Sequence, residues 1–247
     1  MQNISRIYAL SKRNIILRYK NSLVGFFWGF FKPLLYLLIF IAIFSKIPSN
    51  HIDNYILYVT SGLIFWFFFS NVTNQSVGSI ISSAGLIKSL NIPVLFFPLS
   101  EILSELFNFI LTILVFLVVM HWFGITYSFR LLLILPCVLL FSLFSLGITL
   151  FLSAINVFFR DVGILWGTIQ PAIFYLTPIG YREDLVPPFI VQFNPIYYFI
   201  KLGRTIFHES EVPSAMLWMQ CICISFGMYI VGAFVFNKLK NQFISTI

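Results

Sequence analysis

Charged side chains are scarce in this chain. They make up 9% of the 247 residues, against about 25% in a soluble domain whose surface must face water. Hydrophobic residues make up 60% of the chain, and the mean hydropathy is +0.96. This composition excludes an ordinary water-soluble enzyme, a disordered tail and a nucleic-acid-binding domain, and it indicates a chain embedded in lipid.

Residues that usually carry chemistry are also few. The three cysteines, Cys137, Cys221 and Cys223, lie inside apolar runs and show neither a disulfide framework nor metal-binding spacing. The three histidines are scattered, and no phosphate loop of the G-x-x-x-x-G-K-[ST] kind is present. We therefore expect no metal site, no catalytic residue and no cofactor on this chain.

Long apolar runs dominate what is there. A helix needs about 20 apolar residues to cross a bilayer core of about 30 Å, because backbone groups cannot stay unpaired in hydrocarbon. Six stretches meet this requirement: 24–44, 55–78, 102–123, 131–157, 162–181 and 215–236. Their continuous apolar character differs from the alternation of outer-membrane strands. The sequence thus predicts an all-α polytopic membrane protein with six transmembrane helices in one domain over residues 1–247.

Basic residues at both chain ends predict the orientation. Five cations precede the first apolar run, and two follow the last: Arg6, Lys12, Arg13, Arg18, Lys20, Lys238 and Lys240. Lysine and arginine are retained on the cytoplasmic side of membrane proteins. We therefore expect both termini to be cytoplasmic, together with the loop around Lys88 and the turn at Arg160.

The first 22 residues have the pattern of an amphipathic helix. Cations at seven-residue spacing fall on one face, and apolar side chains lie opposite: Arg6, Arg13 and Lys20 against Ile4, Tyr8 and Ile15. A helix of this kind lies in the membrane interface, so residues 1–22 are predicted to be an interfacial helix. The alternative is a basic leader that is merely solvated.

Small and ionisable residues mark the start of the first run. Gly25 and Gly29, four residues apart, allow two helix backbones to approach closely and predict a packed helix pair, either within the chain or across a dimer. Lys32 lies within the run and is a functional candidate for that reason. Its alternative role is to reach the headgroups from a position near the inner boundary.

Residues 79–93 are less apolar than the runs on either side and end at Pro93. They are predicted to contain a short cytoplasmic helix. Leu86, Ile87 and Leu90 have a spacing that suits a small apolar surface for docking into a groove on a soluble partner. The alternative is an ordinary connecting loop.

Two further features leave alternatives open. Glu101 and Glu105, at i and i+4, are expected to face water or to meet a basic partner such as Lys88, in preference to forming a catalytic pair. Segment 182–213 continues a proline-rich region whose apolar pieces are too short to span, which is typical of a re-entrant hairpin. This outer hairpin is either a structural cap or a gate.

Several motifs, in order along the chain, resemble those of a known family. They are RYKNSLVGFFWGFFKPLL (18–35), GLIKSLNIPVLFFPLSEIL (85–103), SAINVFFRDVGILW (153–166), TPIGY (177–181) and FNPIYYFI (193–200). The chain resembles the membrane subunit of type-2 ABC exporters, in the branch that exports lipid-linked polysaccharide such as O-antigen, capsule or teichoic acid. Lys32 and Gly85 depart from the usual residues of that branch.

The resemblance implies partners and a location. Two copies would form a homodimer in the bacterial cytoplasmic (inner) membrane, and two separate ATPase subunits would hold ATP and magnesium. The coupling helix that docks into each ATPase would contain Leu86, Ile87, Lys88, Leu90 and Asn91.

The resemblance also implies a path for the glycan between the subunits, closed by the outer hairpin. Aromatic residues of spans one, two and five would line it: Trp28, Phe31, Tyr36, Trp66 and Tyr175. Arg160 and Asp161, at a cytoplasmic turn, are expected to form an ion pair or cap that fixes the start of the fifth span. Contact with the substrate is the alternative for these two.

Other classes of function remain as competing hypotheses. Within the same family, the cargo could be a drug, a lipid or another small molecule. A channel or proton-coupled carrier would need ionisable residues along a path, for which Lys32 is the candidate. A membrane-embedded enzyme acting on glycans would need paired carboxylates, for which Glu101 and Glu105 come nearest. Dependence on a co-expressed ATPase separates the exporter from the last two.

Overall fold

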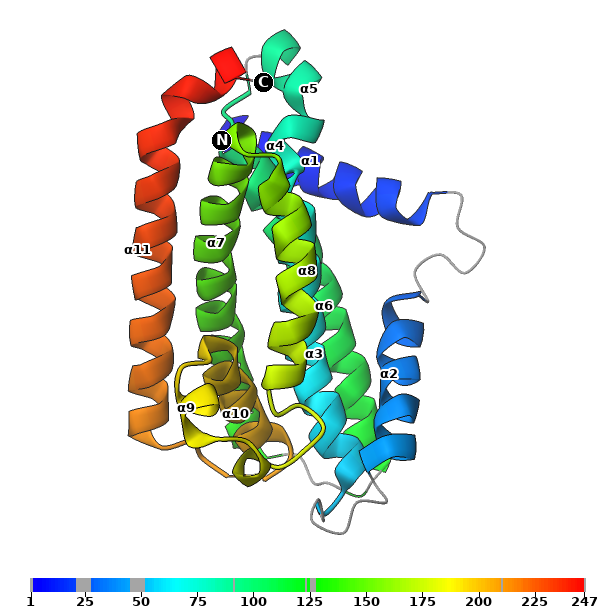
Figure 1. Cartoon of the computed structure of the whole chain (residues 1–247). Coiled ribbons are helices and arrows are strands. Elements are labelled where there is room, and N and C mark those ends of the chain that lie inside the picture. Colours follow the sequence, from blue (N-terminus) through cyan, green and yellow to red (C-terminus); the bar gives the residue numbers. More distant parts are fainter. Residues whose placement is uncertain are drawn as a thin grey trace.

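The computed structural model describes residues 2–20, 28–44, 52–90, 92–122, 124, 128–209 and 211–246. All regular secondary structure in these ranges is helical, which confirms the all-α prediction. Figure 1 shows a bundle of long helices that run side by side, with α5 at one end and the short helices α9 and α10 at the other. These ends are named the α5 end and the hairpin end below.

The helices follow the predicted runs in order. Their bounds are α1 Gln2–Tyr19, α2 Trp28–Phe44, α3 Tyr55–Val77, α4 Ser79–Ser82, α5 Ala84–Leu90, α6 Phe96–Trp122, η3 Phe129–Leu133, α7 Ile134–Phe158, α8 Asp161–Leu176, η4 Glu183–Leu185, α9 Pro188–Gln192, α10 Pro195–Phe207 and α11 Ala215–Thr246. The start of α1 and the end of α11 both lie at the α5 end (Figure 1).

Among the described residues, four helices are long and apolar enough to cross a membrane. They are α3, α6, η3 continued by α7, and the part of α11 that ends at Phe243. The described helices in the first and fifth predicted spans, α2 and α8, are shorter, with 17 and 16 residues. The six-span count therefore stays a prediction.

Local sequence explains where several helices begin. α6 starts at Phe96, before the predicted span, with Pro98 in its first turn, where a missing backbone N–H costs nothing. α10 starts with Pro195, and the side chain of Asn194 before it accepts hydrogen bonds from the N–H groups of Ile196 and Tyr197. The asparagine thus satisfies two donors that the first turn leaves unpaired.

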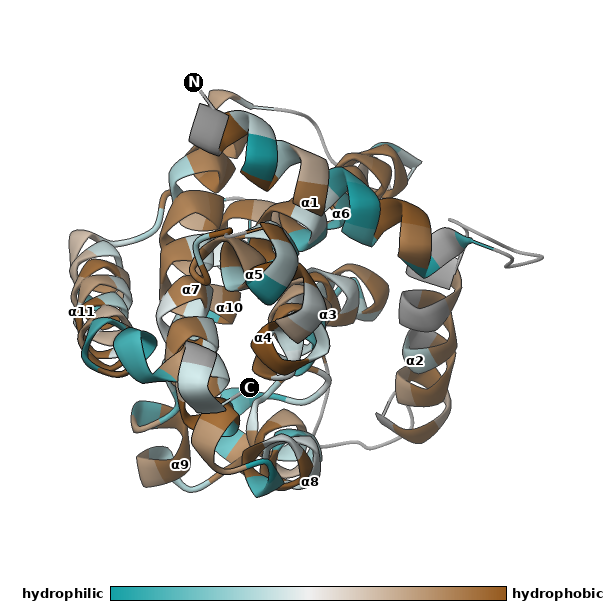
Figure 2. Cartoon of the chain, turned by 90° about the horizontal axis from the view of Figure 1, so that it is seen from above, coloured by the Kyte–Doolittle hydropathy of each residue, from teal (hydrophilic) through white to brown (hydrophobic). Residues whose placement is uncertain are grey.

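The main core surrounds α3, which contacts α2, α6, α7, α8 and α10. A helix that is apolar on all sides is buried on all sides, and the apolar part of α3 follows this rule. Aromatic side chains dominate the packing: the rings of Phe68 and Phe109 stack with their centroids 4.5 Å apart. α2 and α11 lie on opposite sides of the bundle (Figure 2).

A second apolar cluster holds the α5 end together. Six helices contribute its buried members: Leu10, Ile80, Ile87, Phe96, Phe97, Leu150, Ala154, Val157, Phe236 and Phe243. This cluster fixes the position of α5 relative to the long helices, because Ile87 is one of its members.

α1 lies across the long helices at the α5 end and packs against α6 (Figure 2). The helix confirms the predicted helical state of this segment. Leu10 and Ser11 are buried on its contact face, whereas Ile4 and Tyr8 are exposed on one flank. The exposed Arg6 and Arg13 occupy another face. Its place in the membrane interface stays a prediction.

Candidate functional site

The short helix α5 presents two different faces. Ile87 is 4% exposed and packs in the second cluster, with the partly buried Leu86 against it. Leu90 is 58% exposed, and Lys88 and Ser89 beside it are exposed too. The inner face therefore anchors the helix, while the outer face exposes an apolar and a cationic side chain. Asn91, the fifth residue of the predicted coupling set, lies outside the described residues.

The α5 end is strongly cationic. Its exposed basic side chains come from α1, α5, the α7–α8 turn and α11: Arg6, Lys12, Arg13, Lys88, Arg160, Lys238 and Lys240. Asp161 is an exposed carboxylate at the same end. An excess of cations is typical of the cytoplasmic side of a membrane protein.

The turn between α7 and α8 contains the predicted pair. Arg160 directly precedes α8, and Asp161 is its first residue, where a carboxylate is favourable near the helix N-terminus. The side chain of Asn156 in α7 accepts a hydrogen bond of 3.1 Å from the backbone N–H of Gly163. Asn156 was not singled out in the sequence, although it lies in the motif 153–166.

A group of polar side chains ties α1 to α3 and α6. Arg18 of α1 forms an ion pair with Glu105 of α6 and donates a hydrogen bond to Gln75 of α3. Gln75 in turn donates to Glu105 at 2.8 Å. Asn14 donates to Glu101 at 2.9 Å. Glu105 thus has a basic partner, as one of the two alternatives foresaw, and that partner is Arg18.

A second polar group joins α3 to α8 within the bundle. Ser70 donates to the side-chain oxygen of Gln170 at 3.0 Å, and the amide of Gln170 donates to Thr73 at 2.9 Å. Asn74 also donates to Gln170. Polar groups that pair across helices are a device for holding membrane helices together. No pattern along the sequence distinguishes these four, because their pairing depends on how α3 and α8 face each other.

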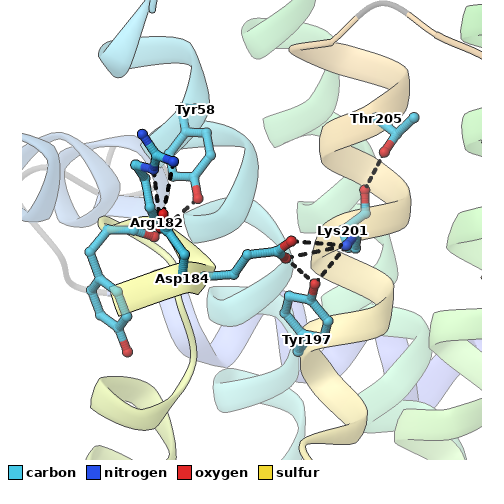
Figure 3. Close-up of polar contacts among 8 residues, drawn as sticks. Tyr58, Arg182, Asp184, Tyr197, Lys201 and Thr205 are labelled. Atoms are coloured by element: carbon cyan, nitrogen blue, oxygen red, sulfur yellow. Dashed lines mark hydrogen bonds and ion pairs between the residues drawn. The ribbon is translucent and has the colours of Figure 1, made fainter. Parts of the chain in front are cut away.

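Ion pairs and tyrosines cover the hairpin end (Figure 3). Arg182 forms a two-pronged pair with Asp184 at 2.8 and 3.0 Å. Lys201 donates to the carboxylate of Glu183 at 3.2 Å, and Tyr197 donates to the same carboxylate. Burial and the hydrogen bond to Glu183 raise the pKa of Tyr197, so the phenol stays protonated and remains a donor.

An apolar cavity of about 480 Å³ lies between α7, α8 and the hairpin. Aromatic and aliphatic side chains make up most of its lining: Phe69, Phe144, Ile148, Trp166, Ile173, Leu176, Phe189, Ile190, Phe193 and Ile196. The indole N–H of Trp166 has no hydrogen-bond partner among the described residues.

The predicted path residues separate into two environments. Phe31 and Tyr175 are exposed on α2 and α8. Trp66 is buried in the core of the chain, and the partly buried Tyr36 packs edge-on against Phe67 and Phe174. The Trp28 side chain lies outside what the structure describes, and so do Gly25 and the Lys32 side chain, on which the helix-pair and ionisable-residue predictions depended.

Known proteins are similar to this chain along nearly its whole length. The family described as "ABC-2 type transporter" matches residues 5–208. An O-antigen export system permease protein RfbA of Klebsiella pneumoniae is 30% identical and aligns over 96% of this chain and 93% of its own length. The protein of the same name from Myxococcus xanthus is 25% identical and aligns over 98% of this chain and 95% of its own length.

Proteins of capsule export are similar too. The capsule polysaccharide export inner-membrane protein CtrC of Neisseria meningitidis serogroup B is 24% identical, over 92% of this chain and 90% of its own. The family match covers far more than half of the residues. It agrees with the described part of the chain, which is an all-helical bundle with four helices able to span a membrane. The chain belongs to the ABC-2 type transporter family.

Proposed function

We propose that this chain is the permease subunit of an ATP-driven exporter that moves a lipid-linked polysaccharide across the bacterial cytoplasmic membrane. The observation that carries the proposal is the α5 surface. A helix anchored by buried Ile87 presents exposed Leu90 and Lys88 at the cationic end of the bundle. The names of the relatives, which refer to O-antigen and capsule export, support the class of cargo.

The proposed complex contains two copies of this chain and separate ATPase subunits. ATP and magnesium bind to those subunits. The α5 end faces the cytoplasm, which places both termini there and the hairpin of α9 and α10 at the outer side. In this arrangement α2 and α8 complete six crossings. ATP-driven closure of the ATPases is transmitted through Leu86, Ile87, Lys88, Leu90 and Asn91 to the long helices.

The glycan passes between the two copies. The exposed side chains on α2 and α8 suit this path, because Phe31 and Tyr175 point away from the core of their own chain. Trp66 and Tyr36 lie on the core side of α8 and hold it in place through ring contacts with Phe174. The hairpin end closes the path when the exporter is idle.

Reconstitution tests the proposal. The chain is placed in lipid vesicles with and without the ATPase subunit of the proposed complex, and the transfer of lipid-linked polysaccharide is measured after ATP is added. We expect transfer that needs both proteins and hydrolysable ATP. Transfer without the ATPase would contradict the proposal. In cells, deletion should cause glycan to accumulate inside; without this accumulation, the cargo is a drug, a lipid or another small molecule.

A further inference from the structure

The turn that follows α8 has an unusual set of hydrogen bonds. Four successive backbone carbonyls, those of residues 178–181, all accept a hydrogen bond from a side chain of another helix. Arg204 of α10 donates to the first two carbonyls at 3.1 Å each. Tyr55 of α3 donates to the third at 2.7 Å, and Tyr58 donates to the fourth at 3.0 Å. We name this arrangement the α8–α10 junction.

Arg204 is buried in the junction, with 5% of its surface exposed. Its guanidinium carbon lies 3.5 Å from the centre of the Tyr58 ring, so the cation stacks on that face while two N–H contacts reach the carbonyls. Among the described residues Arg204 forms no ion pair. Burial lowers the pKa of its guanidinium. A buried cation without a carboxylate partner is costly, which indicates a role for it beyond filling space.

The type of side chain matters here. Both hydrogen bonds to the carbonyls come from one guanidinium nitrogen, Nη2, while the planar guanidinium stacks on the Tyr58 ring. A lysine presents a point charge on a flexible chain and cannot reproduce the planar stacking. The close approach of Gly62 allows this placement, because a Cβ on that glycine would lie 3.1 Å from Nη2 of Arg204.

The junction connects a firmly held helix to a loosely held one. α10 is buried along most of its length, and its Gly203 packs against the ring of Phe65. α8 has few buried residues, and Ile164, Leu165 and Tyr175 are exposed. The turn that follows α8 is buried, with Ile179 1% exposed, so the outer end of α8 is held by apolar packing together with these side-chain hydrogen bonds.

We propose that Arg204 is a positioning residue that makes the outer end of α8 and the hairpin helix α10 move as one unit during transport. The inference rests on the proposed exporter function for its consequence, which is the tight coupling of hairpin movement to ATP hydrolysis. A displacement of α8 that starts at the α5 end then moves α10 by the same amount.

Cross-linking in the complete complex with the ATPase tests the junction without reference to the cargo. Leu176→Cys on α8 and Phe193→Cys on the hairpin line the same cavity and are accessible, and Cys223→Ser removes the native exposed thiol. With Arg204 present, we expect the rate of bridging by a short bifunctional maleimide to be the same with and without ATP. In Arg204→Met the rate should depend on ATP. Equal rates in both proteins would overturn the proposal.

A second measurement tests how tightly glycan transport is coupled to ATP hydrolysis. In Arg204→Met the glycan moved per ATP hydrolysed should fall at least about fivefold, the lower end of ordinary coupling between sites. The cross-link between the two engineered cysteines should then restore it, which a purely structural role of Arg204 would not allow. If wild-type complexes move no glycan, the proposed function fails, while the ATP dependence of cross-linking still decides on the junction.

Milder variants cover the case in which Arg204→Met does not fold. Arg204→Lys keeps the charge but loses the planar stacking on Tyr58, and it should show ATP-dependent cross-linking. Tyr58→Phe keeps the ring and both hydrogen bonds of Arg204, so it should behave like the wild type. Tyr198→Phe is the matched control on α10, because the Tyr198 hydroxyl donates to Gln192 within the hairpin. It should behave like the wild type, and a control that matched Arg204→Lys would contradict the proposal.

Discussion

Gly147 of α7 and Gly232 of α11 bring their two helix backbones into direct contact. A Cβ atom on Gly232 would lie 2.0 Å from the carbonyl oxygen of Gly147, and one on Gly147 would lie 2.4 Å from the carbonyl oxygen of Met228. Small residues at such crossings let membrane helices associate through van der Waals packing. The pair of glycines thus explains how the last long helix is held to the bundle.

Gly232→Val should separate α7 from α11. The collision is with backbone, which cannot rotate away, so we expect a loss of at least about 1–3 kcal/mol of stability. Thermal unfolding in detergent micelles measures it. Gly227→Val is the matched control on the same helix, because nothing lies within 4 Å of a Cβ there. Equal melting temperatures for the two variants would show that the contact is unimportant.

Removal of Arg18 should loosen α1 from the bundle. Arg18→Met leaves the carboxylate of Glu105, which is 2% exposed, without its cation. The expected cost is about 3–5 kcal/mol, typical of a buried ion pair that loses one partner. Proteolysis of α1 in the folded protein checks it. Arg13→Met, an exposed change on the same helix, should have little effect, and Arg18→Met together with Glu105→Met should recover part of the loss.

Two substitutions in α5 should separate docking from folding. Leu90→Asp changes an exposed side chain, so the protein should stay folded but no longer co-purify with its ATPase. Ile87→Asp buries an unpaired charge in the second cluster and should cost about 3–5 kcal/mol, with loss of folded protein. Val212→Asp places the same charge on an exposed residue far from α5 and should leave co-purification unchanged. Normal co-purification of Leu90→Asp would remove α5 as the docking surface.

Gln170→Met should weaken the attachment of α8 to α3. The change keeps the volume of the side chain but removes its hydrogen bonds with Ser70 and Thr73. Interhelical hydrogen bonds in membranes contribute about 0.6 kcal/mol on average and up to about 1.7. Thermal unfolding against wild type measures this loss. Thr168→Val serves as the control, since its hydroxyl bonds within α8; a larger loss for Thr168→Val would contradict the assignment.

Several parts of the fold could be predicted from local sequence. The apolar runs indicated the positions of the long helices, because the hydrophobic length of a span is a property of consecutive residues. The short helix in 79–93 was predicted from a segment that is less apolar than its neighbours and ends at Pro93, and α5 lies within it. The third span was predicted to begin at residue 102, whereas α6 begins at Phe96. The helix starts earlier because Pro98 is compatible with a first helical turn.

The predicted coupling set shows where the sequence stops being informative. Leu86, Ile87 and Leu90 have the same apolar character, so their pattern could not tell an anchor from a docking surface. The structure buries Ile87 and exposes Leu90 because α5 packs on the second cluster through one face. The pairing of Arg18 with Glu105, 87 positions apart in the chain, was equally out of reach.

By itself, the sequence determined that this chain is helical, apolar and built to lie in a membrane with cationic ends, because composition and run length act locally. Only the tertiary structure decided which glycines touch, which carboxylate receives Arg18 and which carbonyls Arg204 reaches. Those contacts depend on how each helix is rotated and tilted against its neighbours. That choice is made by the packing of side chains from distant segments, and hydropathy along the chain does not record it.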